Sequence, residues 1–327
     1  MSNSRASSRI QAGDRQDMRK AFINTLTKIC EEDKNTILVT GDLGFSVFET
    51  FRDKFPNQFL NAGVAEANLI GMSAGMAMGG MKVYAYSIAP FLVYRAFEQI
   101  RNDVSYHNLP VKIVGVGGGL AYGNAGPSHH ATEDIALMTS VPNMTVICPG
   151  DPLEVEKAIL ASHNLDGPIY IRLNRSGDSI IHRNSEIDFK IGKGLILNKG
   201  EDVLIVTTGN MLEVGDKLAK RLDKYGLSIS LISMHTLKPF DSALVNKESR
   251  GKKLIISLEE HSPYGGLSSL MSRTLVMNGI HTLYLPFTLP DIFTKVSASQ
   301  TFLREIYGID ADSIFLKVIR TLENGIS

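Results

Sequence analysis

Glu66 is the residue in this chain whose surroundings point most directly to chemistry. It is the only charged residue between Lys54 and Lys82. It begins a run of small and apolar residues, and a helix that is apolar on every face must be buried. A carboxylate there must be paired, protonated or working, because burying an unpaired charge is costly. A first-turn acid stabilised by the helix dipole is the alternative, and both interpretations stay open.

Two adjacent histidines, His129 and His130, stand in the segment GPSHH. They belong to a turn-rich loop at 117–134, and loops carry catalytic groups more often than packed elements do. An ordinary surface role is the alternative. Adjacent histidines are poor joint ligands for one metal, and no HxxxH or Cys/His array accompanies them. The sequence therefore predicts no metal site.

Several of these polar residues follow predicted strands: Asp42, Ser46, Glu66, Arg175 and the 117–130 loop. Ligands of open parallel sheets bind outside the carboxyl ends of the strands, so we expect these residues to share one rim. An acid in an apolar setting, a histidine pair and a cation suit proton transfer on an anionic substrate.

The elements that must position these residues alternate between strand and helix. The strands are near-continuously apolar, which is typical of a parallel sheet covered on both faces. We therefore predict an α/β fold, with a mostly parallel doubly wound sheet followed by a second, smaller α/β domain. In the first domain the predicted strands are 35–44, 58–64, 81–87, 110–116, 144–149 and 168–173, and the predicted helices are 17–32, 65–79, 92–106, 133–140 and 151–163.

A polar stretch at 175–190 marks the predicted boundary between the domains. We expect a flexible start at 1–16, a first domain at 17–185 and a second at 190–327. The segment LEEH, which ends at His261, is expected to make an interdomain or subunit contact rather than to catalyse. In the second domain we predict strands at 202–209, 227–233, 253–260 and 281–286, a turn at 237–241, and helices at 211–225, 265–278, 299–307 and 311–323.

Composition excludes several classes of function. The 34 Lys and Arg residues balance the 34 Asp and Glu residues, so no net field attracts nucleic acid or an anionic membrane. No apolar run approaches the ~18 residues of a membrane span, and the polar start lacks the core of a signal peptide. Cys30 and Cys148 show neither metal spacing nor a disulfide framework. We expect a cytoplasmic protein that binds neither nucleic acid nor membrane.

A set of stretches becomes specific when taken together, in order and with their spacing. They are GDLGFS, FLNAGVAEANLIGMSAGMA, RAFEQIRND, LPVKIVGVGGGLAYGNAGPSHHATEDIALM, PNMTVICPGD, LKPFD, LEEH and GGL. Over about 17–325 the chain resembles the C-terminal portion of transketolases, which are thiamine-diphosphate enzymes. The resemblance implies a pyrimidine-binding domain at about 17–185 and a transketolase C-terminal domain at about 190–327.

The resemblance also implies roles at the cofactor. Glu66 matches the glutamate that hydrogen-bonds N1′ of the aminopyrimidine, and a carboxyl in an apolar pocket can share a proton with a ring nitrogen. Asp42 and Leu43 match residues that line the thiazolium region. Phe91 is the expected ring that stacks on the aminopyrimidine, although Leu92 can occupy that position in a neighbouring register.

On the substrate side, His129 matches the family's substrate-facing histidine, and we place His130 beside it in the substrate site. Arg19, Ser46 and Arg175 match residues that hold a sugar's terminal phosphate, a task that suits the planar donor fork of arginine. Sugar phosphates are therefore the expected substrates. Ala125 and Gly117 depart from the family's acid and second histidine, which puts the usual pentose and hexose phosphates in doubt.

The family binds the cofactor's diphosphate and Mg²⁺ through a separate N-terminal domain with a GDG…N signature, which this sequence lacks. We therefore expect an N-terminal transketolase subunit as partner, holding the diphosphate and metal in an α2β2 assembly around a two-fold axis. The predicted helix at 66–79 is expected to contribute to that interface.

The sequence thus predicts the C-terminal subunit of a split transketolase, which moves a two-carbon ketol unit from a phosphorylated ketose to an aldose. The β-subunit of a 2-oxoacid dehydrogenase E1, or an enzyme like deoxyxylulose-phosphate synthase, is the alternative. A regulatory or scaffolding subunit is a third possibility, and the presence of Glu66 and His129 disfavours it.

Overall fold

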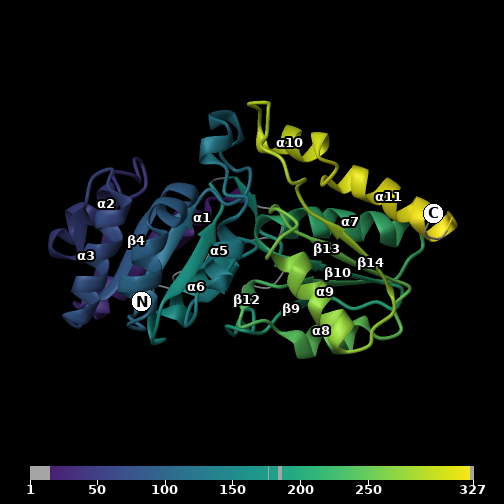
Figure 1. The fold of residues 1–327 in the computed structure, drawn as a ribbon, viewed down its shortest axis with the longest axis horizontal. Coiled ribbons are helices and arrows are strands. Elements are labelled where there is room, and N and C mark those ends of the chain that lie inside the picture. The colour runs from purple at the N-terminus through teal and green to yellow at the C-terminus, as the bar shows by residue number, and fades with distance from the viewer. Residues whose placement is uncertain (1–14, 176, 183–185, 325–327) are drawn as a thin grey trace, which may run out of the picture.

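The computed structural model describes residues 15–175, 177–182 and 186–324. It has two α/β domains side by side, each a sheet covered by helices on both faces (Figure 1). The fold class is the one predicted. Residues 1–14 of the expected flexible start lie outside the described residues. The next two residues form a short strand, β1 (Arg15–Gln16), which pairs antiparallel with β8 (Asp178–Ser179) in the polar boundary stretch.

The first sheet has seven strands in the order β12-β6-β7-β5-β4-β2-β3. All neighbours are parallel except β12 and β6, which run antiparallel. The strands are β2 (Thr36–Thr40), β3 (Phe59–Asn61), β4 (Lys82–Ile88), β5 (Val111–Val116), β6 (Thr145–Ile147), β7 (Ile169–Leu173) and β12 (Thr236–Lys238).

Helices cover both faces of this sheet. Apolar residues of the first and sixth helices pack on one face, and those of the third and fifth pack on the other. Asp17 and Asp151 cap the first and sixth helices by accepting from backbone N–H groups, as short polar N-cap side chains do. The helices are α1 (Met18–Glu32), α2 (Glu49–Lys54), α3 (Glu66–Met78), α4 (Phe97–Gln99), α5 (Asp134–Ser140) and α6 (Pro152–His163).

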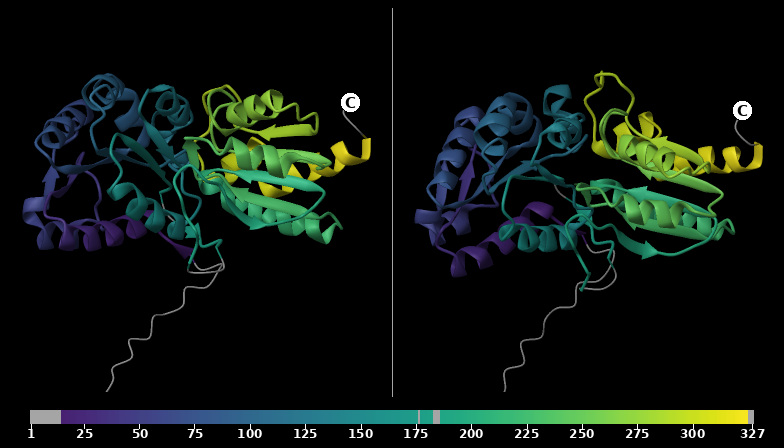
Figure 2. Two further views of the ribbon diagram at one scale, coloured as in Figure 1. Left: turned by 90° about the horizontal axis from the view of Figure 1, so that it is seen from below. Right: turned by 60° about the horizontal axis from the view of Figure 1, so that its bottom comes forward.

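The second sheet has five strands in the order β14-β13-β10-β11-β9, with only β9 antiparallel. The strands are β9 (Leu195–Asn198), β10 (Val203–Thr207), β11 (Ile229–Ser233), β13 (Leu254–Leu258) and β14 (Leu283–Phe287). The helices are α7 (Leu212–Lys224), α8 (Ser242–Ser249), α9 (Leu267–Met277), α10 (Gln300–Ile306) and α11 (Ala311–Asn324). Figure 2 shows α11 extending along the outside of this domain to the end of the described chain.

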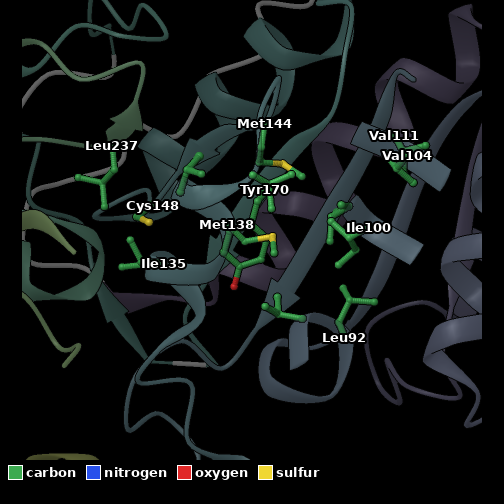
Figure 3. Close-up of a cluster of buried hydrophobic side chains, with 14 of the residues drawn as sticks. Leu92, Ile100, Val104, Val111, Ile135, Met138, Met144, Cys148, Tyr170 and Leu237 are labelled. Atoms are coloured by element: carbon green, nitrogen blue, oxygen red, sulfur yellow. The ribbon is translucent and has the colours of Figure 1, made fainter. Parts of the chain in front are cut away.

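The two domains share a hydrophobic core. The strand β12 follows the second domain's β11 in the chain, yet it completes the edge of the first sheet beside β6. One cluster of buried side chains runs from α3 through Met138 and Cys148 to Leu237 and residues of the second sheet. Figure 3 shows Met138, Cys148 and Leu237 of this cluster. The core on one face of the first sheet therefore continues into the second domain.

Two elements differ from the predictions in ways that matter for the site. The helix expected at 92–106 is instead two π-helical segments, Phe91–Arg95 and Ile100–Ser105, on either side of the short α4. The expectation that α3 is buried all round is also wrong for this chain alone, because Gly75 and Met78 are exposed, Met78 by 59%. The helix buries one face against the sheet and leaves an apolar strip uncovered.

Candidate active site

Glu66 is the first residue of α3 and is almost fully buried, with 1% of its surface exposed. Its Oε2 lies 2.8 Å from Nη1 of Arg95, and its Oε1 accepts a long hydrogen bond of 3.4 Å from the Ser87 hydroxyl. The carboxylate is therefore paired, one of the states that the sequence left open. Sequence reasoning missed Arg95, although the available signal was an isolated cation, the first charged residue after Lys82.

A row of side chains leads from this pair along one rim. The Phe91 ring lies beneath the Arg95 guanidinium, 5.7 Å from ring centre to Cζ. The same ring meets the His129 ring edge-on at a centroid distance of 4.9 Å. His129 also lies 6.0 Å from the ring of Tyr122, over which the guanidinium of Arg175 sits at 4.7 Å. Glu66, Phe91, His129 and Arg175, all chosen from the sequence, are thus brought together.

Phe91 and Leu92, the two candidates for the side chain that stacks on the pyrimidine, lie in different surroundings. Leu92 is fully buried in the core beneath the sheet, whereas Phe91 is only partly buried and faces His129. The π-helical turn at Phe91–Arg95 places the Phe91 ring under the guanidinium that ends the turn. Of these two side chains, the Phe91 ring is therefore the one that lies beside Arg95, the partner of the buried carboxylate.

Arg19 belongs to the same neighbourhood but is already engaged. Its guanidinium forks onto the carboxylate of Asp17, with Nη2 to Oδ2 at 2.5 Å and Nε to Oδ1 at 3.1 Å. The hydrogen bond that Arg19 donates to Asp17 outweighs burial and raises the pKa of Arg19, and Tyr122 is among the groups that act on it. A phosphate at this end of the rim would meet Arg175 directly and Arg19 only in competition with Asp17.

Asp42, Leu43 and Ser46 occupy the turn after β2. Asp42 and Ser46 both have a positive φ, 58° and 64°, which few residues other than glycine adopt. Asn61 fixes the turn, because its Oδ1 accepts from the Asp42 backbone and its Nδ2 donates to the Asp42 carboxylate at 2.9 Å. Leu43 packs against the core between the first sheet and the helices α1 and α6, while the side chains of Asp42 and Ser46 are exposed.

His130 faces different surroundings from His129. It is only 4% exposed, and its Nε2 has no hydrogen-bond partner within the described residues. It lines a cavity of about 340 Å³ with Tyr94, Glu133, Phe293 and others, between the glycine-rich loop and the second domain. Burial lowers the pKa of His130, which favours the neutral form of the ring. The structure does not bring His130 into the row that contains His129.

The LEEH segment holds the domains together. Glu259 accepts hydrogen bonds from the backbone of Leu267 and Ser268 and so caps α9, at 2.7 and 2.8 Å. Glu260 accepts from the Leu120 backbone at 2.7 Å and pairs with Arg304. His261 is fully buried, and its Nε2 accepts a weak bond from the Ala136 backbone at 3.4 Å. The expected interdomain contact is what the geometry provides.

Other features bear on the expectations from composition. In residues 15–175, 177–182 and 186–324, no group of three or more His, Cys, Asp and Glu side chains could hold a metal ion. Over those same residues, the helices are all too short or too polar to cross a bilayer. Cys30 and Cys148 are free and buried, and burial raises the pKa of each thiol to about 12, so neither is a nucleophile at neutral pH.

Comparisons with known proteins match both domains. Residues 14–177 match the family model of the transketolase pyrimidine binding domain, and residues 192–314 match that of the transketolase C-terminal domain. A candidate transketolase C-terminal section of Methanocaldococcus jannaschii is 36% identical over 314 residues, covering 95% of this chain and 98% of that protein.

Two further proteins share almost the full length. One of the subunits of the apulose-4-phosphate transketolase of Phocaeicola vulgatus is 34% identical over 297 residues, covering 90% of this chain and 94% of that protein. Among solved structures, a split-gene transketolase in an inactive β4 tetramer superposes with a TM-score of 0.86 at 33% identity. That alignment covers 94% of this chain and 98% of that one.

Proposed function

Because the chain belongs to the transketolase family, we propose that it is the C-terminal subunit of a split transketolase that depends on thiamine diphosphate. It transfers a two-carbon ketol unit from a phosphorylated ketose to an aldose. The observation that carries the proposal is Glu66, a buried carboxylate on the same rim as Phe91 and His129.

The residues at the rim fit the aminopyrimidine of this cofactor. A buried carboxylate oxygen, Oε1 of Glu66, accepts a long bond from Ser87, and it can engage a ring nitrogen. Phe91 offers a partly exposed aromatic face beside it, and Leu43 a partly buried apolar one. When bound, the cofactor supplies a carbanion-stabilising centre, while the protein binds and orients it.

The roles of this chain's residues follow from their places. With the cofactor bound, Glu66 would share a proton with the ring nitrogen N1′, and Phe91 would hold the pyrimidine ring. Asp42 and Leu43 would line the thiazolium end. His129 donates a hydrogen bond to the donor's carbonyl oxygen, where negative charge develops, a form of stabilisation that works best from fixed groups.

The substrate's tail is assigned to the far end of the rim. Arg175, which lies over the Tyr122 ring, binds the terminal phosphate together with Ser46. Arg19 joins them when its guanidinium exchanges the Asp17 carboxylate for the phosphate. Arginine forks match phosphate geometry. The name of the relative from Phocaeicola vulgatus makes apulose 4-phosphate the first sugar to try.

The diphosphate and Mg²⁺ are assigned to a partner subunit in an α2β2 assembly in the cytoplasm. Support comes from two relatives of matching length, one a C-terminal section and the other a single subunit of a larger enzyme, and from the solved relative whose β4 form is inactive. By this proposal the present chain alone does not turn over substrate.

The test is to purify the chain with its partner and assay the complex on phosphorylated ketoses, apulose 4-phosphate and 2-oxoacids. Replacement Glu66→Ala is expected to lower turnover by about 10²–10⁴-fold, the usual contribution of a proton-transfer group. Glu98→Gln, an exposed acid on α4, is the matched control and is expected to leave turnover unchanged.

The same assay separates the alternatives. Consumption of 2-oxoacids without ketol transfer between sugars would favour an E1-type or deoxyxylulose-phosphate-synthase-type enzyme. Full turnover by the assembled Glu66→Ala complex would overturn the mechanism, and a wild-type complex that is inactive on every substrate would favour a scaffolding subunit.

A further inference from the structure

The buried carboxylate of Glu66 has a dedicated counter-charge. Arg95 reaches it from the next helical segment, 29 residues further along the chain, and places Nη1 2.8 Å from Oε2. The two partners differ sharply in exposure: the Glu66 side chain is 2% exposed and the Arg95 side chain is 56% exposed. The ion pair therefore links a buried carboxylate to a guanidinium that is open to solvent.

This arrangement divides the two carboxylate oxygens between different tasks. Oε2 is committed to Arg95, while Oε1 faces the Ser87 hydroxyl at 3.4 Å. A Cβ at Gly41 would lie 3.2 Å from that hydroxyl, so the glycine leaves room for the Ser87 side chain beside Glu66. A buried carboxylate needs a partner to remain charged, and Arg95 supplies the charge without occupying the second oxygen.

We propose that Arg95 is a positioning residue of the site: it holds Oε2 of Glu66 and so turns Oε1 toward the cofactor's ring nitrogen. This inference rests on the proposed function.

The Phe91 ring lies between the Glu66–Arg95 pair and His129. Its ring lies 5.7 Å from the Arg95 guanidinium on one side and 4.9 Å from the His129 ring on the other. A cation over an aromatic face is attracted to it, and the attraction restricts where the guanidinium can lie. The ring that is to stack on the pyrimidine thus also helps to hold the counter-charge of Glu66.

The first test uses the chain alone and thermal unfolding. Arg95→Met keeps much of the apolar stem but removes the charge, and it is expected to lower the melting midpoint in the wild-type background. In the Glu66→Gln background, where the buried charge is gone, the same change is expected to have little effect. Arg101→Met, at an exposed arginine hydrogen-bonded to the neighbouring Asn102 side chain, is the control. Equal effects in both backgrounds would overturn the pairing.

The second test measures the affinity of the assembled complex for thiamine diphosphate with Mg²⁺ by calorimetry. Arg95→Met is expected to weaken binding about tenfold or more, because Glu66 loses the contact that turns Oε1 toward the ring nitrogen, whereas Arg101→Met is expected to bind as wild type does. Arg95→Lys, which restores a charged donor, should recover part of the affinity. In the Glu66→Gln background Arg95→Met is expected to have little further effect on affinity, whereas a purely structural role of Arg95 would give the same loss in both backgrounds.

Equal cofactor affinity in wild type and Arg95→Met would overturn the role of Arg95 while leaving the proposed function intact. A wild-type complex that binds no cofactor at all would overturn the proposed function, and the role of Arg95 in it, whatever the unfolding measurements show.

Discussion

His129 and His130 are adjacent in the chain, yet their rings meet different groups. His129 lies between Phe91 and Tyr122, and His130 is buried beside a cavity that faces the second domain. In the reconstituted complex, His129→Ala is expected to lower kcat/KM by about 10²–10⁴-fold, as loss of a group at the reacting atoms does. His130→Ala is expected to change kcat/KM only a few-fold. Steady-state kinetics of both variants check this, and equal losses would place both rings at the substrate.

The sequence was enough to single out Glu66 and several polar residues near it, but not to predict which charged side chains form pairs. Glu66 stood out because its surroundings were apolar, and the structure buries it. Its partner Arg95 is distant in sequence, and the two meet only because β4 and a π-helical turn intervene. Likewise, the fork between Arg19 and Asp17 depends on side-chain rotamers that no motif encodes. Isolated charges are visible in a sequence, whereas the contacts between them come from tertiary packing.

At the element scale, Asp178 joins the boundary stretch to the start of α1. It lies in β8, is buried, and accepts a hydrogen bond from the Met18 backbone at 3.4 Å and another from the Asn174 side chain. Burial outweighs these bonds and raises the pKa of Asp178 to about 6, against about 3.9 for an unfolded aspartate. Below about pH 4 the Asp178 carboxyl is protonated in both the folded and the unfolded protein. As the pH rises from there through about 6, the carboxyl ionises more easily in the unfolded protein, so the free energy of unfolding falls.

Asp178→Asn is therefore expected to leave stability unchanged near pH 4 and to raise the free energy of unfolding by up to about 3 kcal/mol at pH 8, since each pKa unit is worth about 1.4 kcal/mol. Asn174 can turn its amide to accept from the new side chain, because its Oδ1 has no partner among the described residues. Denaturant unfolding at the two pH values measures the difference, with the exposed Asp188→Asn as control. A loss of stability at pH 8 would contradict the prediction.

Elements with a strong apolar pattern were predictable, and those that depend on distant partners were not. The parallel strands β2, β4, β5, β7, β10 and β13 coincide with apolar runs in the sequence. By contrast, the sequence predicted a turn where the three residues of β12 pair with β6, a strand much earlier in the chain. It also missed β9 and α8, whose segments carry weak patterns. Short elements gain their stability from the sheet edge or face that receives them, which local sequence does not show.

At the scale of the whole molecule, a buried ion pair helps to join the domains. Arg172 donates Nε to Asp134 at 2.8 Å and Nη2 to the backbone carbonyls of Ala131 and Glu260, at 2.7 and 3.1 Å. Arg172→Met leaves Asp134 charged and buried, so it is expected to cost about 3–5 kcal/mol. Lys220→Met, which breaks an exposed pair with Asp216 on α7, should cost about 0.5 kcal/mol or less. Denaturant midpoints of the two variants compare them directly.

The exposed strip of α3 is where we expect this chain to meet other subunits. Gly75 and Met78 lie uncovered on a helix whose other face carries the core, and the exposed Val64 lies just before its first residue. Small and apolar residues allow close approach between subunits, and a patch of this kind is costly to leave in water. Because Glu66 begins the same helix, we expect a subunit that covers the whole length of α3 to reach the buried carboxylate.

Met78→Lys is therefore expected to weaken association of this chain with its partner and with itself by at least tenfold, because it places a charge in an apolar contact. Analytical ultracentrifugation over a concentration series measures the change, and Val276→Lys, an exposed apolar residue on α9 of the other domain, is the control. Suppose that Met78→Lys, and not the control, dissociates the assembly and removes turnover while the isolated chain stays folded. The subunit that covers α3 is then also the one that completes the active site. If turnover survives dissociation, the site is complete within a single chain, and the proposed dependence on a partner is wrong.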